Sequence, residues 1–510
     1  MAHRELPARP DLDHLKKEAK ALRRAFLEGD PAAVERVEAI VGPKAELKLT
    51  EAQRAVAREY GFSSWVKLRE HVQSARRSGD ALESFLAAVE RHDRAAASRV
   101  LESEPGLASS SLHVASILGL ETEVERLIAR DDGGVRALAG ATWPAEPLLW
   151  LCFSPFHGES PARDRGLLAS ARALLAAGAD PNVREVRHGV SALYGVTGLS
   201  HAPEIARLLL EAGAEPNDGE SVFHAAERFH EEALELLLSH GADLNATGDW
   251  GNTPLYFLLR YWDVARERRV EQGLRWLLAH GADPNVLCDR EERESSLHVA
   301  VHRGQHPDVV GLLLRHGADV HARRGDGRTA WTLARRGGFG ELVALLESAG
   351  ARPEPLSAVD RLLEACGRGD AAAARRLAVP AVASGLRPGE ARLIVQAAAE
   401  GLFEVVRACL AAGFPVDTAD ETGATALHHA AIHGRASIVR ELLGHGADHS
   451  IRDSEHSSTP LGWACFGVDF LQDESGDHAG AVEALLEAGA VVSKDEHRTR
   501  DHSVRQLLDR

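Results

Sequence analysis

The sequence predicts an all-α fold: about twelve helix pairs stack into a solenoid with short hairpin turns, preceded by a small N-terminal helical region. The first observation behind this prediction is an apolar helix tail followed by Gly-Ala and usually Asp, as in LLLSHGADLN and LLAHGADPN. It returns at intervals of 28 to 43 residues, with one longer gap of 63. Periods of this size are the signature of stacked structural repeats. The glycines of this phrase are Gly178, Gly213, Gly241, Gly281, Gly317 and Gly446, with weaker copies at Gly350, Gly413 and Gly489.

A second phrase precedes the tails and usually begins with Ser or Thr. It reads SSLHVA at 110–115 and 295–300, SVFHAA at 221–226 and TALHHA at 425–430, with looser forms at 252–258 and 458–464. The two phrases in register resemble the ankyrin repeat, whose pattern is a turn, T-P-L-H-x-A and two short helices. The resemblance covers about residues 81–492. It implies that inner helices and hairpin tips line a groove for a partner protein.

The chemistry of these phrases explains why they form helix pairs. The Ser or Thr can accept a backbone N–H and cap the inner helix. The Gly after each outer helix suits the left-handed position that ends a helix, and the Asp, Asn or Pro that follows favours a turn. Each pair has one apolar face that it cannot bury alone, so neighbouring pairs stack.

Residues 1–78 form a separate N-terminal helical region with 16 Lys and Arg against 12 Asp and Glu. Four helices are expected there. The first spans about 11–28, and Asp30 with Pro31 begins the second. Thr50 and Gln53 have the spacing of a capping box for the third helix, and Ser63 or Ser64 caps the fourth.

This region is similar to the N-terminal helical region of bacterial ankyrin-repeat proteins, through LPARPDLDHLKKEAKALRRA at 6–25 and AQRAVAREYGFSSWVKLREHV at 52–72. The resemblance implies a bacterial source. The two helices that meet at Gly61 also allow a helix-turn-helix interpretation. We favour a structural cap or docking region, because Trp65, Leu68 and Val72 share one apolar face.

The solenoid is expected over 81–492, followed by a C-terminal capping tail at 493–510. Longer repeats lie near 144–183, 252–286 and 458–492, and their extra residues, near 154–166, 260–270 and 467–479, are expected between the two helices. A divergent unit at 357–385 explains the long glycine gap. The preceding ARPEPL segment, 351–356, is either a hinge or a divergent hairpin, and we favour the hairpin. The other units are expected near 81–107, 109–137, 190–217, 220–246, 295–322, 327–353, 389–418 and 424–451.

Composition narrows the class of protein. The 59 basic and 76 acidic residues give a net charge of −17, which argues against a broad nucleic-acid or anionic-membrane surface. The five cysteines lack paired spacing, which indicates reduced thiols and a cytoplasmic location. No run approaches 18 apolar residues, so no membrane span is expected, and the first residues lack a signal-peptide core.

Eight of the 26 histidines belong to the repeat phrases and are expected to have structural roles. The family resemblance implies that those of the Leu-His position bond to backbone or hydroxyl groups of adjacent turns. His429 and His433, four residues apart, have the spacing of zinc ligands, but no third ligand completes a site. We therefore predict no metal. The eight are His113, His224, His298 and His428 in the Leu-His position, and His240, His280, His316 and His445 before Gly-Ala-Asp.

Candidate partner-binding residues lie at predicted hairpin tips and on inner helices. Trp250 is expected at a tip where a large aromatic ring is hard to bury, and aromatic and arginine side chains are common interface anchors. The long repeats add further aromatic residues, which either pack locally or contact a partner. The predicted partner-binding residues are Trp250, Phe257, Tyr261, Trp262, His302, Arg303, Arg323, Arg324, His429, His433 and Trp463.

No motif of known catalytic chemistry is present: the sequence lacks GxxxxGK, HExxH, GxSxG and Cys-x-x-Cys. We therefore predict a non-catalytic interaction scaffold, a monomer without cofactor, whose partner is another protein. Two alternatives stay open. One is a nucleic-acid-linked regulator that uses residues 1–78, and the other is a secreted effector that binds a host protein.

Overall fold

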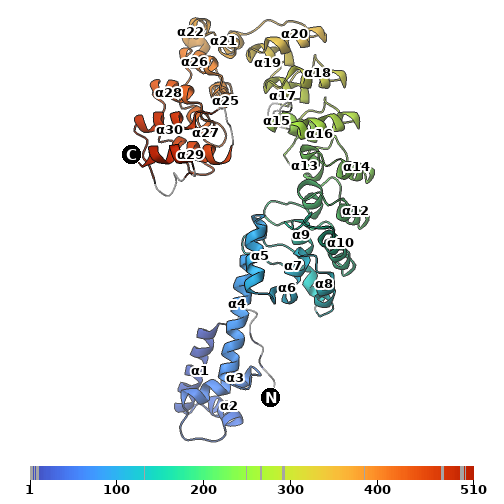
Figure 1. Ribbon diagram of the computed structural model, residues 1–510, viewed down its shortest axis with the longest axis vertical. Coiled ribbons are helices and arrows are strands. Elements are labelled where there is room, and N and C mark those ends of the chain that lie inside the picture. Colours follow the sequence, from blue (N-terminus) through green and yellow to red (C-terminus); the bar gives the residue numbers. More distant parts are fainter. Residues whose placement is uncertain are drawn as a thin grey trace. The chain divides into compact units, whose positions relative to one another are not determined.

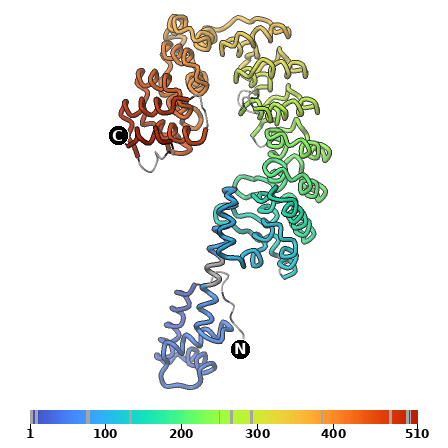
Figure 2. Tube along the Cα trace, viewed as in Figure 1, coloured from blue at the N-terminus to red at the C-terminus, as the bar shows by residue number. Residues whose placement is uncertain are grey.

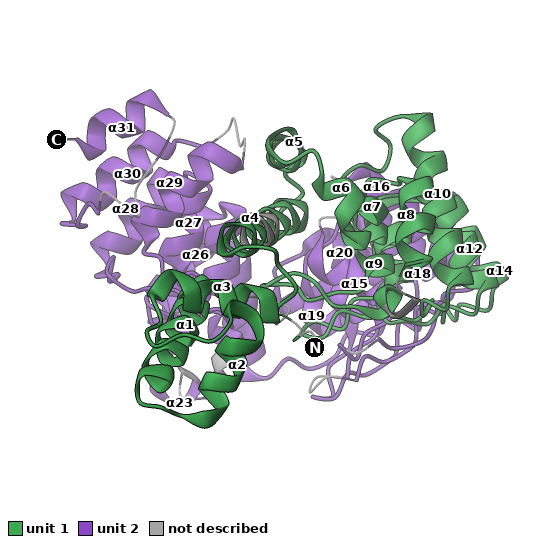
Figure 3. Cartoon of the chain, turned by 90° about the horizontal axis from the view of Figure 1, so that it is seen from below, with its two compact units in different colours: residues 1–243 green, residues 244–510 purple. Residues whose placement is uncertain are grey.

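The computed structural model describes residues 4, 6, 11–130, 132–248, 250–262, 264, 267–289, 293–383, 385–471, 476–493, 499 and 501–509. Within these residues the regular secondary structure is helical, and antiparallel pairing is limited to isolated bridges at turns. The chain divides into two compact units, Met1–Asp243 and Leu244–Arg510 (Figure 3). None of the described helices combines the length and apolar character needed to cross a bilayer. These findings agree with the predicted all-α solenoid.

The N-terminal helices form a small core of their own. The first helix buries Leu15, Ala19, Leu22 and Phe26, which pack together in this core. The carboxylates of Asp11 and Asp30 cap the first two helices, as their side chains accept backbone N–H groups. The four helices are α1 (Leu12–Leu27), α2 (Pro31–Val41), α3 (Leu49–Glu59) and α4 (Trp65–Glu90).

Two details of this region differ from the sequence expectation. The capping box of α3 uses Glu51, whose Oε2 accepts the backbone N–H of Lys48 at 2.9 Å, so the expected pair of Thr50 and Gln53 is wrong. Helix α4 begins at Trp65, where Ser64 caps it, and then runs unbroken to Glu90. The expected boundary between 78 and 81 therefore falls inside a helix.

The rest of the first unit consists of short helices that pack in pairs (Figure 1). Phe156, from the first long repeat, is 2% exposed, and Phe153 packs edge-on against Trp143 and Tyr194. The aromatic residues of this long repeat therefore pack locally. The helices are α5 (Arg94–Ser103), α6 (Leu107–Ser110), α7 (Leu112–Ile117), α8 (Glu121–Ile128), η1 (Asp132–Arg136), α9 (Pro147–Cys152), α10 (Pro161–Ala176), α11 (Ala192–Tyr194), η2 (Gly195–Leu199), α12 (Pro203–Glu211), α13 (Ser221–Arg228) and α14 (Glu231–Ser239).

The second unit continues the helix pairs, which the Cα trace follows one after another (Figure 2). Gly281 and Gly446 have φ of +99° and +84°, the left-handed conformation expected after an outer helix. The first group of helices is α15 (Pro254–Tyr261), α16 (Arg268–Ala279), α17 (Ser296–His302), α18 (Pro307–Arg315), α19 (Ala330–Arg336), α20 (Gly340–Ser348), α21 (Ala358–Gly367) and α22 (Ala371–Leu377). The second group is α23 (Pro380–Ala383), α24 (Pro388–Ala391), α25 (Leu393–Glu400), α26 (Phe403–Ala411), α27 (Ala426–Ile432), α28 (Ala436–Gly444), α29 (Pro460–Phe470), α30 (His478–Glu487) and α31 (His502–Leu508).

The segment around 351–356 joins α20 to α21. It carries no regular secondary structure and none of the β-bridges seen at other turns of the described chain, so the favoured hairpin does not form there. Glu354 holds the segment in place, because its carboxylate accepts hydrogen bonds from Arg323 at 2.5 Å and from Thr332 at 3.2 Å. From α21 onward one apolar core continues as far as Val504 of α31.

Candidate partner-binding surfaces

The histidines of the Leu-His position mostly make the contacts that the family resemblance implies. In His298 the ring Nδ1 accepts the backbone N–H of Ser295 at 3.2 Å, which leaves Nε2–H to donate to the carbonyl of Ala322 at 3.0 Å. His428 does the same with Thr425 and Ser458. Burial lowers the pKa of both rings, and a neutral imidazole suits one accepted and one donated hydrogen bond. These rings therefore fasten one repeat to the next.

His224 departs from this pattern and corrects the expectation for that copy. Its ring nitrogens face two carboxylates, with Nδ1 2.5 Å from Oε2 of Glu227 and Nε2 3.1 Å from Oε2 of Glu220. Burial alone would lower the pKa of His224, but the hydrogen bonds and charges of Glu220 and Glu227 outweigh it and raise the pKa to about 9. The ring lies 4.9 Å from Tyr194. This histidine is a cation held between two acids.

Helices α27 and α29 bring two predicted residues together. His429 of α27 and Trp463 of α29 meet edge-to-face, with 5.3 Å between ring centroids. Each ring is oriented by a carboxylate: Nε2 of His429 lies 2.8 Å from Oδ2 of Asp420, and Nε1 of Trp463 donates to Oδ2 of Asp453 at 3.0 Å. Burial acts to raise the pKa of Asp453, but the hydrogen bonds from backbone N–H groups and from Trp463 have the larger effect and lower the pKa to about 2. The carboxylate is thus ionised and fixes the indole.

Two phenylalanines extend this surface. Phe466 and Phe470 stack with 4.6 Å between ring centroids, yet they are 53% and 58% exposed. Trp463, Phe466 and Phe470 follow an i, i+3, i+7 spacing, so they share one side of α29. We call His429, Trp463, Phe466 and Phe470 the aromatic face. The sequence interpretation placed 467–479 between helices and so missed that α29 continues to Phe470. The i, i+3, i+7 spacing was the signal that could have found it.

His433, the other predicted histidine of this region, is half-buried at the C-terminal end of α27. It does not join His429 in a metal site: across the described residues, no group of three His, Cys, Asp or Glu side chains is arranged to hold an ion. The 2.8 Å contact with Asp420 occupies Nε2 of His429 instead.

The predicted aromatic residues of the long repeat at 252–286 divide into exposed and fixed groups. Trp250 is 68% exposed and Tyr261 is 52% exposed, and the ring of Phe257 lies 5.2 Å from that of Tyr261. Trp262 is half-buried, and its carbonyl accepts a hydrogen bond from Nε2 of Gln305 at 2.5 Å. Trp250 and Tyr261 are therefore accessible, Phe257 is half-buried beside Tyr261, and Trp262 is held against the following repeat.

The predicted basic residues also differ in how far their side chains are exposed. His302 and Arg303 are exposed at the end of α17, and Arg323 is exposed at a turn where it pairs with Glu354. Arg324 is different, because its side chain is only 9% exposed and its guanidinium binds Glu294 at 3.0 Å and Asp326 at 2.8 Å. The structure thus places Arg324 inside the protein, away from the accessible side chains.

Arg324 belongs to an ion-pair network that sequence reasoning missed. Arg328 binds Asp326 at 2.6 Å and Asp360 at 3.2 Å, and Arg336 binds Glu390 at 2.5 Å. Arginines hold the pKa of Asp326 well below its ordinary value, against the opposing effect of burial. No sequence motif predicts this network, because its members lie in different repeats. It contains Glu294, Asp326, Asp360, Glu390, Arg324, Arg328, Arg336 and Arg387.

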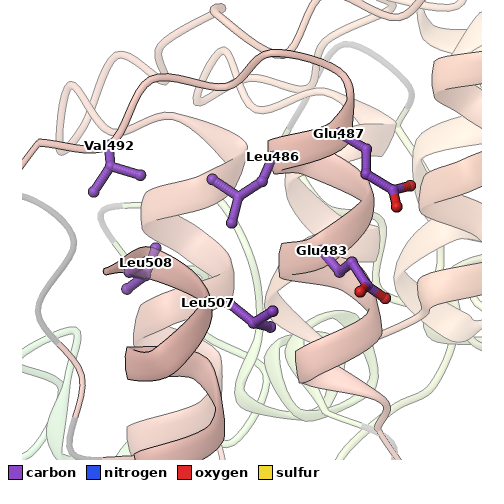
Figure 4. Close-up of a pocket in the computed structure, with 6 residues that line it drawn as sticks. All are labelled: Glu483, Leu486, Glu487, Val492, Leu507 and Leu508. Atoms are coloured by element: carbon purple, nitrogen blue, oxygen red, sulfur yellow. The ribbon is translucent and has the colours of Figure 1, made fainter. Parts of the chain in front are cut away.

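The C-terminal helix creates one shallow cavity, of about 430 Å³ (Figure 4). Leu486, Leu507 and Leu508 line it, while the carboxylates of Glu483 and Glu487 point away from these leucines. Such a lining offers no convergent polar groups, so we do not assign a ligand to it.

Comparison with known proteins agrees with this architecture. Models of ankyrin repeats match residues 222–261, 261–355 and 362–496, more than half of the chain. Human cyclin-dependent kinase 4 inhibitor B is 35% identical over 118 residues, which cover 22% of this chain and 78% of that protein. The ankyrin repeat and KH domain-containing protein mask-1 of Caenorhabditis elegans is 28% identical over 380 residues, 63% of this chain and 14% of that protein.

Other relatives are also matched in part. The chain spans 17% of the length of the potassium channel AKT2/3 of Arabidopsis thaliana. Among solved structures, the human ASB11 ankyrin repeat domain aligns with a TM-score of 0.36 at 26% identity, covering 48% of this chain and 100% of that domain. The repeated phrases, the stacked helix pairs and the matched ankyrin models lead to one conclusion: the chain belongs to the ankyrin-repeat family.

Proposed function

We propose that this chain is a non-catalytic interaction scaffold that binds a partner protein through accessible side chains on its inner helices and turns. One observation carries the proposal: the inner helices α15 and α29 each present exposed aromatic rings. On α15 the exposed Tyr261 packs beside the half-buried Phe257, and on α29 both Phe466 and Phe470 are exposed. Exposed aromatic residues are common anchors of protein interfaces. Ankyrin repeats are protein-interaction modules, and the human relative is named as an inhibitor of a kinase, itself a protein.

The cellular setting belongs to the same proposal. All five cysteines are buried free thiols, which suits a reducing compartment such as the cytoplasm. We propose a monomer there, with residues 1–78 as a structural or docking region. We also propose a bacterial source, because residues 6–25 and 52–72 resemble the N-terminal helical region of bacterial ankyrin-repeat proteins. No observation favours the nucleic-acid-linked regulator or the secreted effector over the scaffold.

The test is affinity capture from the native cell lysate with the full chain as bait. Two variants probe the two aromatic pairs: Phe257→Ala with Tyr261→Ala, and Phe466→Ser with Phe470→Ser. Leu138→Ser with Val186→Ser is the control, because these apolar side chains are 59% and 73% exposed in the other unit. A protein retained by wild type and control but lost with either pair variant supports the scaffold. If the full chain retains no protein specifically, the scaffold proposal is refuted.

A further inference from the structure

We propose that the aromatic face of α27 and α29 binds a basic amphipathic segment of the partner, in which apolar side chains alternate with lysine or arginine. This inference rests on the proposed scaffold function and adds the chemistry of the partner. Three features of the second unit carry it: an exposed row of aromatic rings, a close approach of the two helix backbones beneath the row, and an excess of negative charge.

The row of rings is long enough to hold several apolar side chains. Trp463 and Phe470 are seven residues apart on one helix, which corresponds to about 10 Å along its axis. Phe466 and Phe470 expose more than half of their surface, and Leu471 beside them is 39% exposed. Such rings gain most from burial against apolar groups, because each removes a large apolar area from water.

Contacts within the chain hold the helices and two of the rings of the aromatic face in place without a bound partner. Gly467 lies so close to α27 that a Cβ atom there would be 1.9 Å from the carbonyl oxygen of Ile432. The two helices therefore approach backbone to backbone. Asp453 fixes the indole of Trp463, and Asp420 fixes the ring of His429. A preformed surface loses little conformational entropy on binding, which favours affinity.

The charge around this face is mostly negative. The inner helices α25, α27 and α29 contain no Lys or Arg, whereas α25 ends with Glu400 and α29 carries Asp469. Asp420 and Asp453 add two carboxylates at the other end of the face. Residues 419–471 as a whole contain seven acidic and three basic side chains. One of the three, Arg440, belongs to the outer helix α28, where it donates to the carbonyl of Gly480.

Two earlier inner helices of the same unit, α15 and α19, carry arginine instead. Arg260 lies near the end of α15, and Arg335 and Arg336 end α19. The negative charge is therefore a local property of the aromatic face rather than of every inner helix. An anionic surface with exposed rings complements a segment that carries both cations and apolar groups, since cations are also attracted to aromatic faces.

The experiment uses the full chain and three fluorescein-labelled peptides of equal length. The first alternates Lys and Leu in a helical amphipathic pattern, the second replaces Lys by Glu, and the third replaces Leu by Ser. Fluorescence anisotropy at about 0.15 M salt, where the Debye length is about 8 Å, reduces non-specific attraction to a chain of net charge −17. We expect the Lys/Leu peptide to bind at least about tenfold more tightly than either of the others.

The variants locate the site. Phe466→Ser with Phe470→Ser keeps every charge, and both side chains are largely exposed, so the fold should persist; circular dichroism checks this. We expect this double variant to weaken Lys/Leu binding about tenfold or more, while Leu138→Ser with Val186→Ser leaves it unchanged. Equal binding of the Glu/Leu peptide, or unchanged binding by the phenylalanine variant, would overturn the proposal.

Two further outcomes separate this inference from the proposed function. A partner captured from lysate that still binds the phenylalanine variant leaves the scaffold function intact and refutes the basic-segment site. Sedimentation of the chain alone tests a second copy as the occupant. A dimer that the phenylalanine variant abolishes would also refute the inference, because the face would then be a self-association surface.

Discussion

The guanidinium of Arg324 lies 3.0 Å from the carboxylate of Glu294, thirty residues earlier, and the two side chains are only 9% and 6% exposed. The same carboxylate also accepts the hydroxyl of Tyr256 at 2.8 Å. Three helix pairs are therefore linked through one buried acid. Such a link has little effect while intact, but it leaves an unpaired charge when one partner is removed.

Arg324→Ala should lower the free energy of unfolding by about 3–5 kcal/mol, because Glu294 would stay buried without its cation. Chemical denaturation followed by circular dichroism measures the loss. Arg275→Ala is the matched control: Arg275 forms an exposed pair with Glu271 along one helix, and its loss should cost less than about 1 kcal/mol. Equal losses of unfolding free energy in the two variants would show that the buried pair contributes no more to stability than the exposed one.

Gly467→Ala should separate α27 from α29, because the new methyl group would meet the carbonyl of Ile432 at 1.9 Å. Overpacking of this kind costs about 1–3 kcal/mol or more. Gly444→Ala in α28 meets nothing within 4 Å and should be neutral or slightly stabilising. Thermal unfolding midpoints compare the two, and a neutral Gly467→Ala would contradict the close approach of these helices.

The stability of the first unit should fall as the pH rises from 6.5 to 9. The folded pKa of His224 is about 9, above its ordinary value of 6.5, because Glu220 and Glu227 favour the cation despite its burial. The stabilisation is complete below 6.5 and is lost as the pH passes through 9. Denaturation at both pH values measures the slope. His224→Gln should remove this component, and an unchanged slope in that variant would argue against the cation.

Gln305→Ala should loosen the backbone that presents Tyr261 and Trp262. The buried amide of Gln305 donates to the carbonyls of Leu259 and Trp262, and its oxygen accepts the N–H of Val264 at 3.1 Å. Removing these bonds should cost about 1–3 kcal/mol and speed hydrogen exchange at Val264. Gln396→Ala, which breaks an exposed contact with Glu400, is the control. Full protection of Val264 in the first variant would contradict this role.

Local sequence signals predicted where an N-terminal helix such as α2 begins, but they did not predict where α4 ends. Asp30 with Pro31 begins α2 as the sequence indicates, because cap and first-turn proline act within a few residues. The sequence interpretation ended this region at residue 78, but α4 continues to Glu90 and buries Phe85. Packing that lies beyond the local window decides where such a helix ends.

The exposed site residues show the same division. Trp250 is accessible, as its predicted hairpin tip indicated. Tyr261 is accessible at the end of α15, although the sequence interpretation placed it between two helices. Arg324 had the same turn composition as Arg323, yet its side chain is buried. Neighbouring arginines of one turn point to different partners. Only the placement of Glu294 and Glu354, from other repeats, distinguishes the two.

The sequence by itself determined the repeat architecture and the family, since the Leu-His and Gly-Ala-Asp phrases encode caps, turns and helix ends within each repeat of about 33 residues. Tertiary structure decided which side chains share a surface. The aromatic face joins His429 to Trp463, 34 positions away in sequence, and the ion-pair network joins Arg328 to Glu390. Local chemistry fixes each repeat, but the distances between repeats depend on how their backbones stack, and that is set by contacts between them.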